Sequence, residues 1–223
     1  MQAKPEVHSR YLFPAIVFFL VAQPVVGTLS GTASEVLTIS LAATLVWGVW
    51  SLDHTGVWFR AALGIAFLML ALVATYAVIA RAALLIAALG CLVALAVVCI
   101  GLGIRWLFVS PRVTVQSLLA GMSMYLLLAI TFGILHVGFY VSEPAWYRGV
   151  TPGRRSAEVA ELVYFSIGTL TTVAYGDILP THPVSRLLSN IEAVVGQMYV
   201  AVLVAMLVSG YAAGRKPSGG GDK

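Results

Sequence analysis

The sequence predicts an all-α membrane protein, and three observations support this: composition, the length of the apolar runs and the distribution of charge. Hydrophobic residues make up 60% of the 223 residues and charged residues only 10%, whereas about 25% of a typical soluble domain is charged. A soluble core of this size would not absorb so much apolar surface. Basic residues are scattered at the ends of the apolar runs instead of forming a stripe, so nucleic acid is not an expected partner.

Six apolar runs are each long enough, or nearly so, for a membrane-spanning helix of about 20 residues. They cover residues 11–27, 35–52, 57–80, 82–107, 113–141 and 184–213. Pro14, Gln23 and Pro24 interrupt the first run, for which a signal peptide is the alternative. Since no small-residue cleavage site follows a compact apolar core, a kinked span is favoured. Only Arg81 separates the third run from the fourth, which predicts a tight helical hairpin.

The distribution of basic residues orients these helices, because cytoplasmic loops are enriched in Lys and Arg. Eight of the 13 basic residues fall on one side: Lys4, Arg10, Arg60, Arg105, Arg112, Arg215, Lys216 and Lys223. The other side has Arg81, Arg148, Arg154, Arg155 and Arg186. We therefore expect a plasma-membrane protein with both termini in the cytoplasm and the loop from about 142 to 183 outside.

The outer loop is expected to contain a helix that is too short to span the membrane. Ser156 is a candidate N-cap, and Glu158 lies in the first turn of a helix that runs to about Leu170. The partial negative charge at the C-terminus of this half-helix would favour a cation near the membrane centre. Pro180 and Pro183 then end the following loop and begin the last helix.

A short glycine-bearing stretch, Thr171-Thr172-Val173-Ala174-Tyr175-Gly176-Asp177, follows the half-helix. Non-helical backbone at membrane depth occurs only where protein buries it or where it lines a watery cavity. The stretch resembles the selectivity filter of the potassium channel family, usually T-V-G-Y-G-D, with a departure at Ala174, where the resemblance implies a left-handed backbone. The order of outer helix, half-helix, filter and inner helix extends the resemblance from Arg112 to Tyr211. It implies a homotetramer in which four filter segments surround one axial pore.

The resemblance also implies which residues bind the ion. The carbonyls of Thr172, Val173, Ala174 and Tyr175, with the Thr172 hydroxyl, would replace the water shell of K+, and Gly176 would form the outer mouth. No organic cofactor and no enzymatic activity are expected. The expected partners are K+ and other monovalent cations, membrane lipids and further copies of the chain.

The inner helix has a candidate hinge and a candidate pore-lining face. Gly196 lies where the family often has an inner-helix hinge glycine. In that register the cavity and inner passage would be lined by Gln197, Val200, Val204 and Val208, whose spacing keeps them on one helical face. Ordinary packing of valines between membrane helices is the alternative interpretation.

Three residues, Tyr164, Asp177 and Glu192, are expected to support the filter from behind. By the resemblance, Asp177 would accept a hydrogen bond from Tyr164, and a second bracing carboxylate found in some relatives is missing because Gly168 takes its place. Glu192, the only carboxylate well inside a predicted span, should face the half-helix or a neighbouring subunit. A protonated or hydrogen-bonded structural carboxyl is the alternative. His136 has no partner at metal-ligand spacing, so we expect a surface or packing residue.

The chain is expected to comprise a four-helix N-terminal membrane domain (1–110), a pore domain (111–213) and a short cytoplasmic tail (214–223). The first part takes the place of a voltage sensor, yet its fourth run has only Arg105 within it and Arg81 at its start. Voltage sensing takes several regularly spaced arginines. We therefore expect a voltage-independent, potassium-selective channel. A weakly selective monovalent cation channel is one alternative; a polytopic transporter is another, although no internal repeat supports it.

Overall fold

The computed structural model describes residues 12–27, 32–52, 56–109 and 114–214. Six of the eight basic residues assigned to the cytoplasm, and the expected tail after Gly214, lie outside these ranges. The long helices are α1 (Leu12–Gly27), α2 (Thr32–Leu52), α3 (Val57–Ile79), α4 (Ala82–Val109), α5 (Val115–Ser142) and α7 (Pro183–Gly214). The shorter elements between α5 and α7 are the 3-10 turn η2 (Pro144–Trp146), β1 (Tyr147–Arg148), α6 (Arg155–Leu170) and β2 (Leu179–Pro180).

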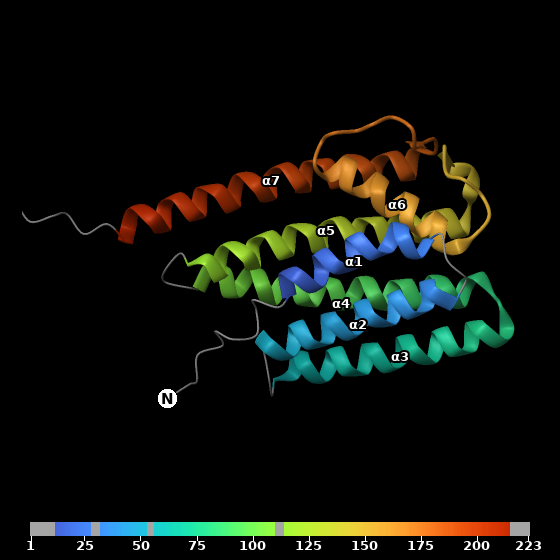
Figure 1. The fold of residues 1–223 in the computed structure, drawn as a ribbon, viewed down its shortest axis with the longest axis horizontal. Coiled ribbons are helices and arrows are strands. Elements are labelled where there is room, and N and C mark those ends of the chain that lie inside the picture. Colours follow the sequence, from blue (N-terminus) through green and yellow to red (C-terminus); the bar gives the residue numbers. More distant parts are fainter. Residues whose placement is uncertain (1–11, 28–31, 53–55, 110–113, 215–223) are drawn as a thin grey trace, which may run out of the picture.

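The long helices run side by side and alternate in direction (Figure 1). The start of α1 and the end of α7 therefore lie at one end of the bundle, and α6 with the loop after it lies at the other. The predicted all-α class is confirmed. Four helices, α3, α4, α5 and α7, are long and apolar enough to cross a membrane, whereas α1 and α2 contain shorter apolar segments (Phe13–Ala22 and Thr38–Leu52). Membrane crossing by these two helices stays a prediction.

The tight hairpin between α3 and α4 is confirmed. Ala80 ends α3 in the left-handed conformation, with φ of 52°, and its N–H donates to the Tyr76 carbonyl at 2.8 Å. A left-handed conformation costs roughly 1 to 2 kcal/mol for a residue with a Cβ. Close packing of α3 along α4 offsets this cost.

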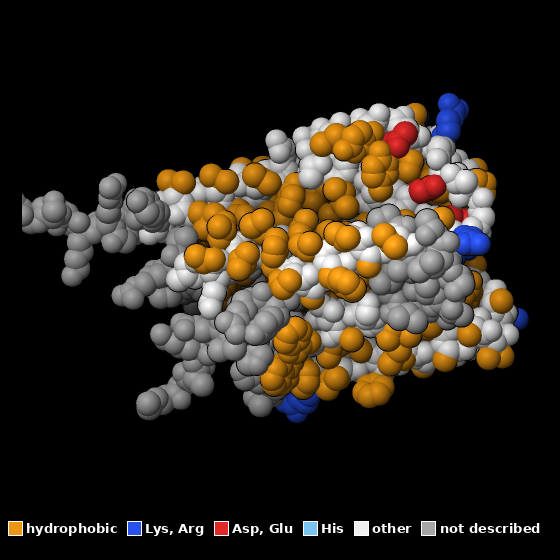
Figure 2. All heavy atoms as spheres, in the orientation of Figure 1, with side chains coloured by type: hydrophobic (Ala, Val, Ile, Leu, Met, Phe, Trp, Pro, Cys, Tyr) orange, Lys and Arg blue, Asp and Glu red, His pale blue; other side chains and the backbone are white. Residues whose placement is uncertain are grey.

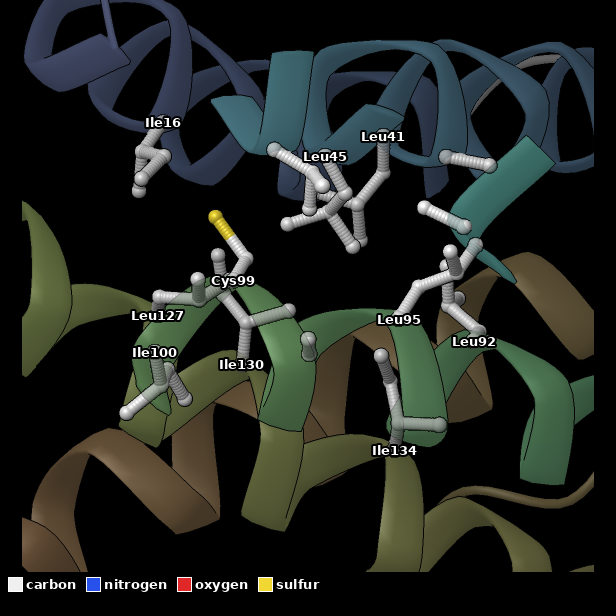
Figure 3. Packing of buried hydrophobic residues seen from close by; sticks show 14 of the residues in the cluster. Ile16, Leu41, Leu45, Leu92, Leu95, Cys99, Ile100, Leu127, Ile130 and Ile134 are labelled. Carbon is white, nitrogen blue, oxygen red and sulfur yellow. The ribbon is translucent and has the colours of Figure 1, made fainter. Parts of the chain in front are cut away.

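One apolar core joins the four N-terminal helices to α5. Side chains from α1, α2, α4 and α5 point toward one another in Figure 3. Its labelled members are Ile16, Leu41, Leu45, Leu92, Leu95, Cys99, Ile100, Leu127, Ile130 and Ile134. Because the core includes α5, the expected domains 1–110 and 111–213 pack closely against each other. The division of the chain into these two domains stays a prediction.

The outer surface is largely apolar. Figure 2 shows hydrophobic side chains along the visible face of the bundle, whereas acidic side chains gather at the end that has α6 and its flanking loops. On α7, large apolar side chains such as Val194, Met198, Val202 and Val208 are exposed. An apolar surface this extensive requires lipid or other subunits to cover it, in agreement with a membrane protein.

Candidate functional site

The short helix α6 is held against α5 by close backbone approach and by two side-chain hydrogen bonds. A Cβ added at Gly133 of α5 would lie 3.1 Å from the Val163 Cα, a tighter contact than most, so the glycine favours this close approach of the two helices. Ser166 donates to the Ala129 carbonyl at 2.6 Å, and Tyr125 donates to the Leu170 carbonyl at 3.2 Å. These contacts fix the direction in which α6 ends.

The start of α6 differs from the expectation. Arg154, and not Ser156, is the N-cap, so the prediction of a Ser156 cap is wrong. Two acidic side chains of the helix bind N–H groups of the preceding loop instead: Glu158 accepts from Gly153 at 3.3 Å and Glu161 accepts from Thr151 at 2.7 Å. The helix therefore begins two residues earlier than expected, and Ser156 is buried inside its first turn. Glu158 lies in the first turn, as expected.

The loop after α6 folds back onto the last turn of that helix. The N–H of Thr172 donates to the Thr169 carbonyl at 3.0 Å. The N–H groups of Val173 and Ala174 both donate to the Gly168 carbonyl, at 2.9 and 3.1 Å. Among the described residues, no hydrogen bond is donated to the carbonyls of 172–175. The loop thus turns its donors toward the helix end and leaves its acceptors available.

The backbone of this loop alternates in hand. Thr172, Ala174 and Gly176 have positive φ, at 61°, 47° and 83°, whereas Val173 and Tyr175 do not. The left-handed conformation expected at Ala174 is confirmed. The same conformation at Thr172 was not foreseen, and it is a genuine outlier for a β-branched residue. Each such residue costs about 1 to 3 kcal/mol, a strain that concentrates at functional sites.

The expected contact between Tyr164 and Asp177 is present. The Tyr164 hydroxyl donates to the Asp177 carboxylate at 2.9 Å. The Tyr164 ring also stacks on the Tyr175 ring, with centroids 5.3 Å apart and planes at 14°. A Cβ at Gly168 would lie 3.5 Å from the Tyr175 ring, so this ring fills the space beside Gly168. One side chain of α6 thus contacts two residues of the loop.

A two-stranded sheet closes the outer end of the loop. Tyr147 pairs with Pro180 and Arg148 pairs with Leu179, in antiparallel register. Gly149 follows with φ of 93°, and a Cβ there would collide with the Asp177 carbonyl. Only glycine therefore fits where the segment after α5 passes behind the loop.

The inner helix α7 approaches the end of α6 at Gly196. The Leu170 carbonyl lies where a Cβ on Gly196 would stand, and the glycine is buried within an uninterrupted helix. Close packing against α6 thus explains a glycine at position 196. A hinge at Gly196 stays a prediction. Further along, Tyr199 donates to the Gly121 carbonyl of α5 at 2.8 Å.

The candidate pore-lining residues share the face of α7 that points away from α5 and α6. They are all exposed: Gln197, Val200, Val204 and Val208. Glu192 and Gly196 of the same helix are buried. The expected register is therefore compatible with a passage on the open side of this chain.

Sequence reasoning missed a buried polar cluster behind the loop. His136 packs in the interior and is not a surface residue, and its hydrogen bonds were not foreseen. Its side chain is fully buried and bonds Tyr147 Oη at 2.6 Å through Nδ1 and Glu192 Oε2 at 3.0 Å through Nε2. Glu192 also bonds Ser166, so it faces the half-helix as expected. The only sequence signal was that His136 and Glu192 both interrupt apolar runs, and such groups need partners.

The chemistry of this region is that of oxygen acceptors and buried hydrogen bonds. Among the described residues no group of three metal-ligand side chains occurs. Burial raises the pKa of the Tyr147 phenol, which therefore stays a neutral donor at physiological pH. A cation at the loop would be held by backbone carbonyls.

Comparison with known protein families identifies a match in the C-terminal half of the chain. Residues 122–211 match a family described as an ion channel. This range begins in α5, includes α6 and the loop, and ends in α7. No curated protein and no solved structure matches the chain.

Proposed function

We propose that this chain conducts K+ passively and selectively through a pore shared by four identical chains. The match of residues 122–211 to an ion channel family supports a channel protein and not an enzyme. K+ would bind at Thr172, Val173, Ala174 and Tyr175, with Gly176 at the outer mouth. Both ends of the chain would face the cytoplasm across the plasma membrane.

The backbone of 172–176 carries this proposal. Its N–H groups bond the carbonyls that end α6, its φ angles alternate in sign, and its carbonyls accept no hydrogen bond among the described residues. Consecutive residues of opposite hand turn their N–H groups to one side of the backbone. The carbonyls then turn to the other side, where a row of them can replace the water shell of K+.

Assembly into a tetramer is proposed because a single chain leaves apolar side chains of the loop and of α7 exposed. Each chain has a single loop of this kind, and Val173 and Tyr175 are 54% and 67% exposed. The candidate pore face of α7 is exposed as well. Neighbouring copies around an axis would cover these apolar side chains and complete the ring of carbonyls.

Voltage independence is proposed from α4. Arg105 is its only basic residue, and it is exposed near the end of the helix. The middle of α4 is apolar and contributes Leu92, Leu95 and Cys99 to the core. Since each charge that crosses the membrane contributes only about 2.3 kcal/mol per 100 mV, one arginine supports at most a shallow voltage dependence. Steeply voltage-dependent opening in planar bilayers would contradict this.

The deciding experiment is a flux assay with purified protein in liposomes. Separate vesicle populations are loaded with K+, Rb+ or Na+, and protein-free liposomes serve as the control. We expect K+ and Rb+ flux well above Na+ flux. Equal K+ and Na+ flux would favour a weakly selective monovalent cation channel, and no flux of any of these ions would reject the proposal.

A further inference from the structure

A continuous chain of hydrogen bonds runs behind the filter loop and joins three helices. It starts at Tyr147, passes through His136 and Glu192 to Ser166, and ends at the carbonyl of Ala129. The His136, Glu192 and Ser166 side chains are fully buried and Tyr147 is only 6% exposed. Bulk solvent hardly reaches these groups, so we assign the protons of the chain among its own members.

The direction of each hydrogen bond can be worked out from the Ala129 end. A backbone carbonyl only accepts, so the single hydroxyl proton of Ser166 is donated to Ala129, at 2.6 Å. The Ser166 oxygen then has no proton left for Glu192, and it must accept one. An ionised carboxylate has no proton to give. The contact between Ser166 and Glu192 therefore requires Glu192 to be the protonated acid.

The remaining contacts agree with a neutral chain. The other Glu192 oxygen accepts from Nε2–H of His136, and the neutral imidazole accepts from the Tyr147 phenol through Nδ1. Tyrosine, histidine, the acid and serine each supply one proton, and each proton is used in one contact. Every member of the chain is satisfied without any charge.

The ion-paired alternative leaves groups unsatisfied. An imidazolium at His136 would donate to both neighbours, so the Tyr147 proton would have no acceptor among the described residues. The Ser166 proton would serve either Ala129 or Glu192 but not both. Two buried charges and an unsatisfied buried donor are each costly.

The surroundings supply no compensating charge. Phe165 of α6 contacts the imidazole edge-on, with centroids 5.0 Å apart, and Tyr140 of α5 lies beside Tyr147. Arg155, on α6, is paired with Glu158 at 2.7 Å. Within the described ranges, no Lys or Arg forms a salt bridge with Glu192.

We propose that Glu192 is a protonated positioning residue, which as a neutral acid ties the inner helix α7 to the half-helix α6 and thereby holds the filter loop in place. Its importance for conduction rests on the proposed channel function. Ser166, its partner on α6, lies two residues before Gly168, whose carbonyl binds the N–H groups of Val173 and Ala174. A displacement of Ser166 would thus move the acceptor that anchors the loop.

Substitutions at Glu192 test whether this side chain acts as a protonated acid or as a carboxylate. Glutamine has the donor and acceptor pattern of the neutral acid, because its amide can donate to Ser166 and accept from His136. We expect Glu192→Gln to keep K+ flux within about twofold of wild type and to share its pH profile from about pH 5 to about pH 8. Glu192→Ala removes the carboxyl group that both His136 and Ser166 bind, so we expect K+ flux to fall about tenfold or more.

A matched pair of serines provides the control. Ser166→Ala removes the hydrogen bond between Glu192 and α6, and we expect a loss of flux comparable to that of Glu192→Ala. Ser189→Ala removes a buried hydroxyl whose one hydrogen bond within the described part of the chain goes to the Ser185 carbonyl of the same helix, at 3.0 Å. We expect Ser189→Ala to conduct like wild type.

Infrared difference spectroscopy decides the protonation state without any flux measurement. Exposed carboxylic acids are ionised at about pH 8, so the carbonyl stretching band of a protonated acid at that pH reports a buried neutral group. We expect this band in the wild type and its absence in Glu192→Gln. Carboxylate bands alone in the wild type would overturn the proposal, whatever the variants do. If no variant or wild type conducts K+, the channel proposal fails while the infrared band still decides the state of Glu192.

Discussion

Two non-glycine residues of the filter loop have left-handed backbone, and they concentrate strain at the proposed ion path. Ala174 has φ of 47° and Thr172 has φ of 61°. Four hydrogen bonds from N–H groups of 171–174 to the last turn of α6 hold this backbone in place. The strain is tolerated because a relaxed backbone would lose these hydrogen bonds to the end of α6.

Replacement of Ala174 by glycine should relieve part of this strain. Glycine adopts positive φ freely, whereas a Cβ costs roughly 1 to 2 kcal/mol there. We expect Ala174→Gly to increase K+ flux and to slow the loss of conduction at low K+ concentration, measured in liposomes. Ala160→Gly, inside α6, is the control and should be mildly destabilising, because glycine weakens a helix interior. Lower K+ flux in Ala174→Gly would show that the alanine stabilises the conducting loop.

The hydroxyl of Tyr164 should matter for the lifetime of the conducting state. Tyr164→Phe keeps the stacking on Tyr175 but removes the hydrogen bond to Asp177. The acceptor is a carboxylate, but the contact is exposed, so solvent weakens its contribution. We expect flux through Tyr164→Phe to decay several-fold faster at low K+. Tyr76→Phe, on α3, is the matched control, and equal decay in both variants would assign Tyr164 to packing.

At the scale of elements, one side of α7 is packed against other helices and another side is exposed. One face packs on α5 and α6 through Glu192, Gly196 and Tyr199, and glycines at 121 and 196 allow the close approach. The other face, with Val200, Val204 and Val208, is open. A helix that packs on one side only needs further partners in a membrane, either lipid or other subunits.

A bulky residue on the open face of α7 should block conduction. We expect Val204→Trp to lower K+ flux strongly, because an indole from each subunit would fill the inner passage. Val202→Trp is the matched control: Val202 is exposed at a groove between α7 and α4 that is lined by Ile104 and Leu107 and has a volume of about 350 Å³. The control should conduct near the wild-type level. Block by Val202→Trp with normal flux in Val204→Trp would place the passage on a different face.

At the scale of the whole molecule, a single chain is incomplete. Lipid or other subunits must cover the exposed apolar surface of the chain. This surface includes the exterior of the bundle, the exposed residues of the filter loop and the open face of α7. Four chains around an axis would provide it and would place four loops around one path.

Native mass measurement in mild detergent tests this assembly. We expect the dominant species to have four times the 23.6 kDa mass of the chain. Tyr175→Ala, which removes an exposed ring at the proposed centre, should shift the distribution toward smaller species, whereas Phe67→Ala on the exposed face of α3 should not. A monomer or dimer as the sole wild-type species would contradict the shared pore.

The sequence by itself was sufficient for the features that depend on neighbours along the chain. The apolar runs predicted the long helices to within a few residues, Arg81 between two runs predicted the α3–α4 hairpin, and Pro183 predicted the start of α7. The left-handed conformation at Ala174 was implied by the resemblance of the filter motif, and the facing of Glu192 toward α6 follows from helical periodicity.

The tertiary structure decided what depends on pairing between distant segments. His136 and Glu192 are 56 positions apart, and their contact exists only because α5 and α7 pack in one register against α6. The cap at Arg154 depends on how Glu158 and Glu161 bind the loop before α6, and the core that joins α1 to α5 depends on helix packing. Local propensity does not determine these contacts, because the free energy that selects among them comes from burying polar groups with partners and fitting side chains across helices.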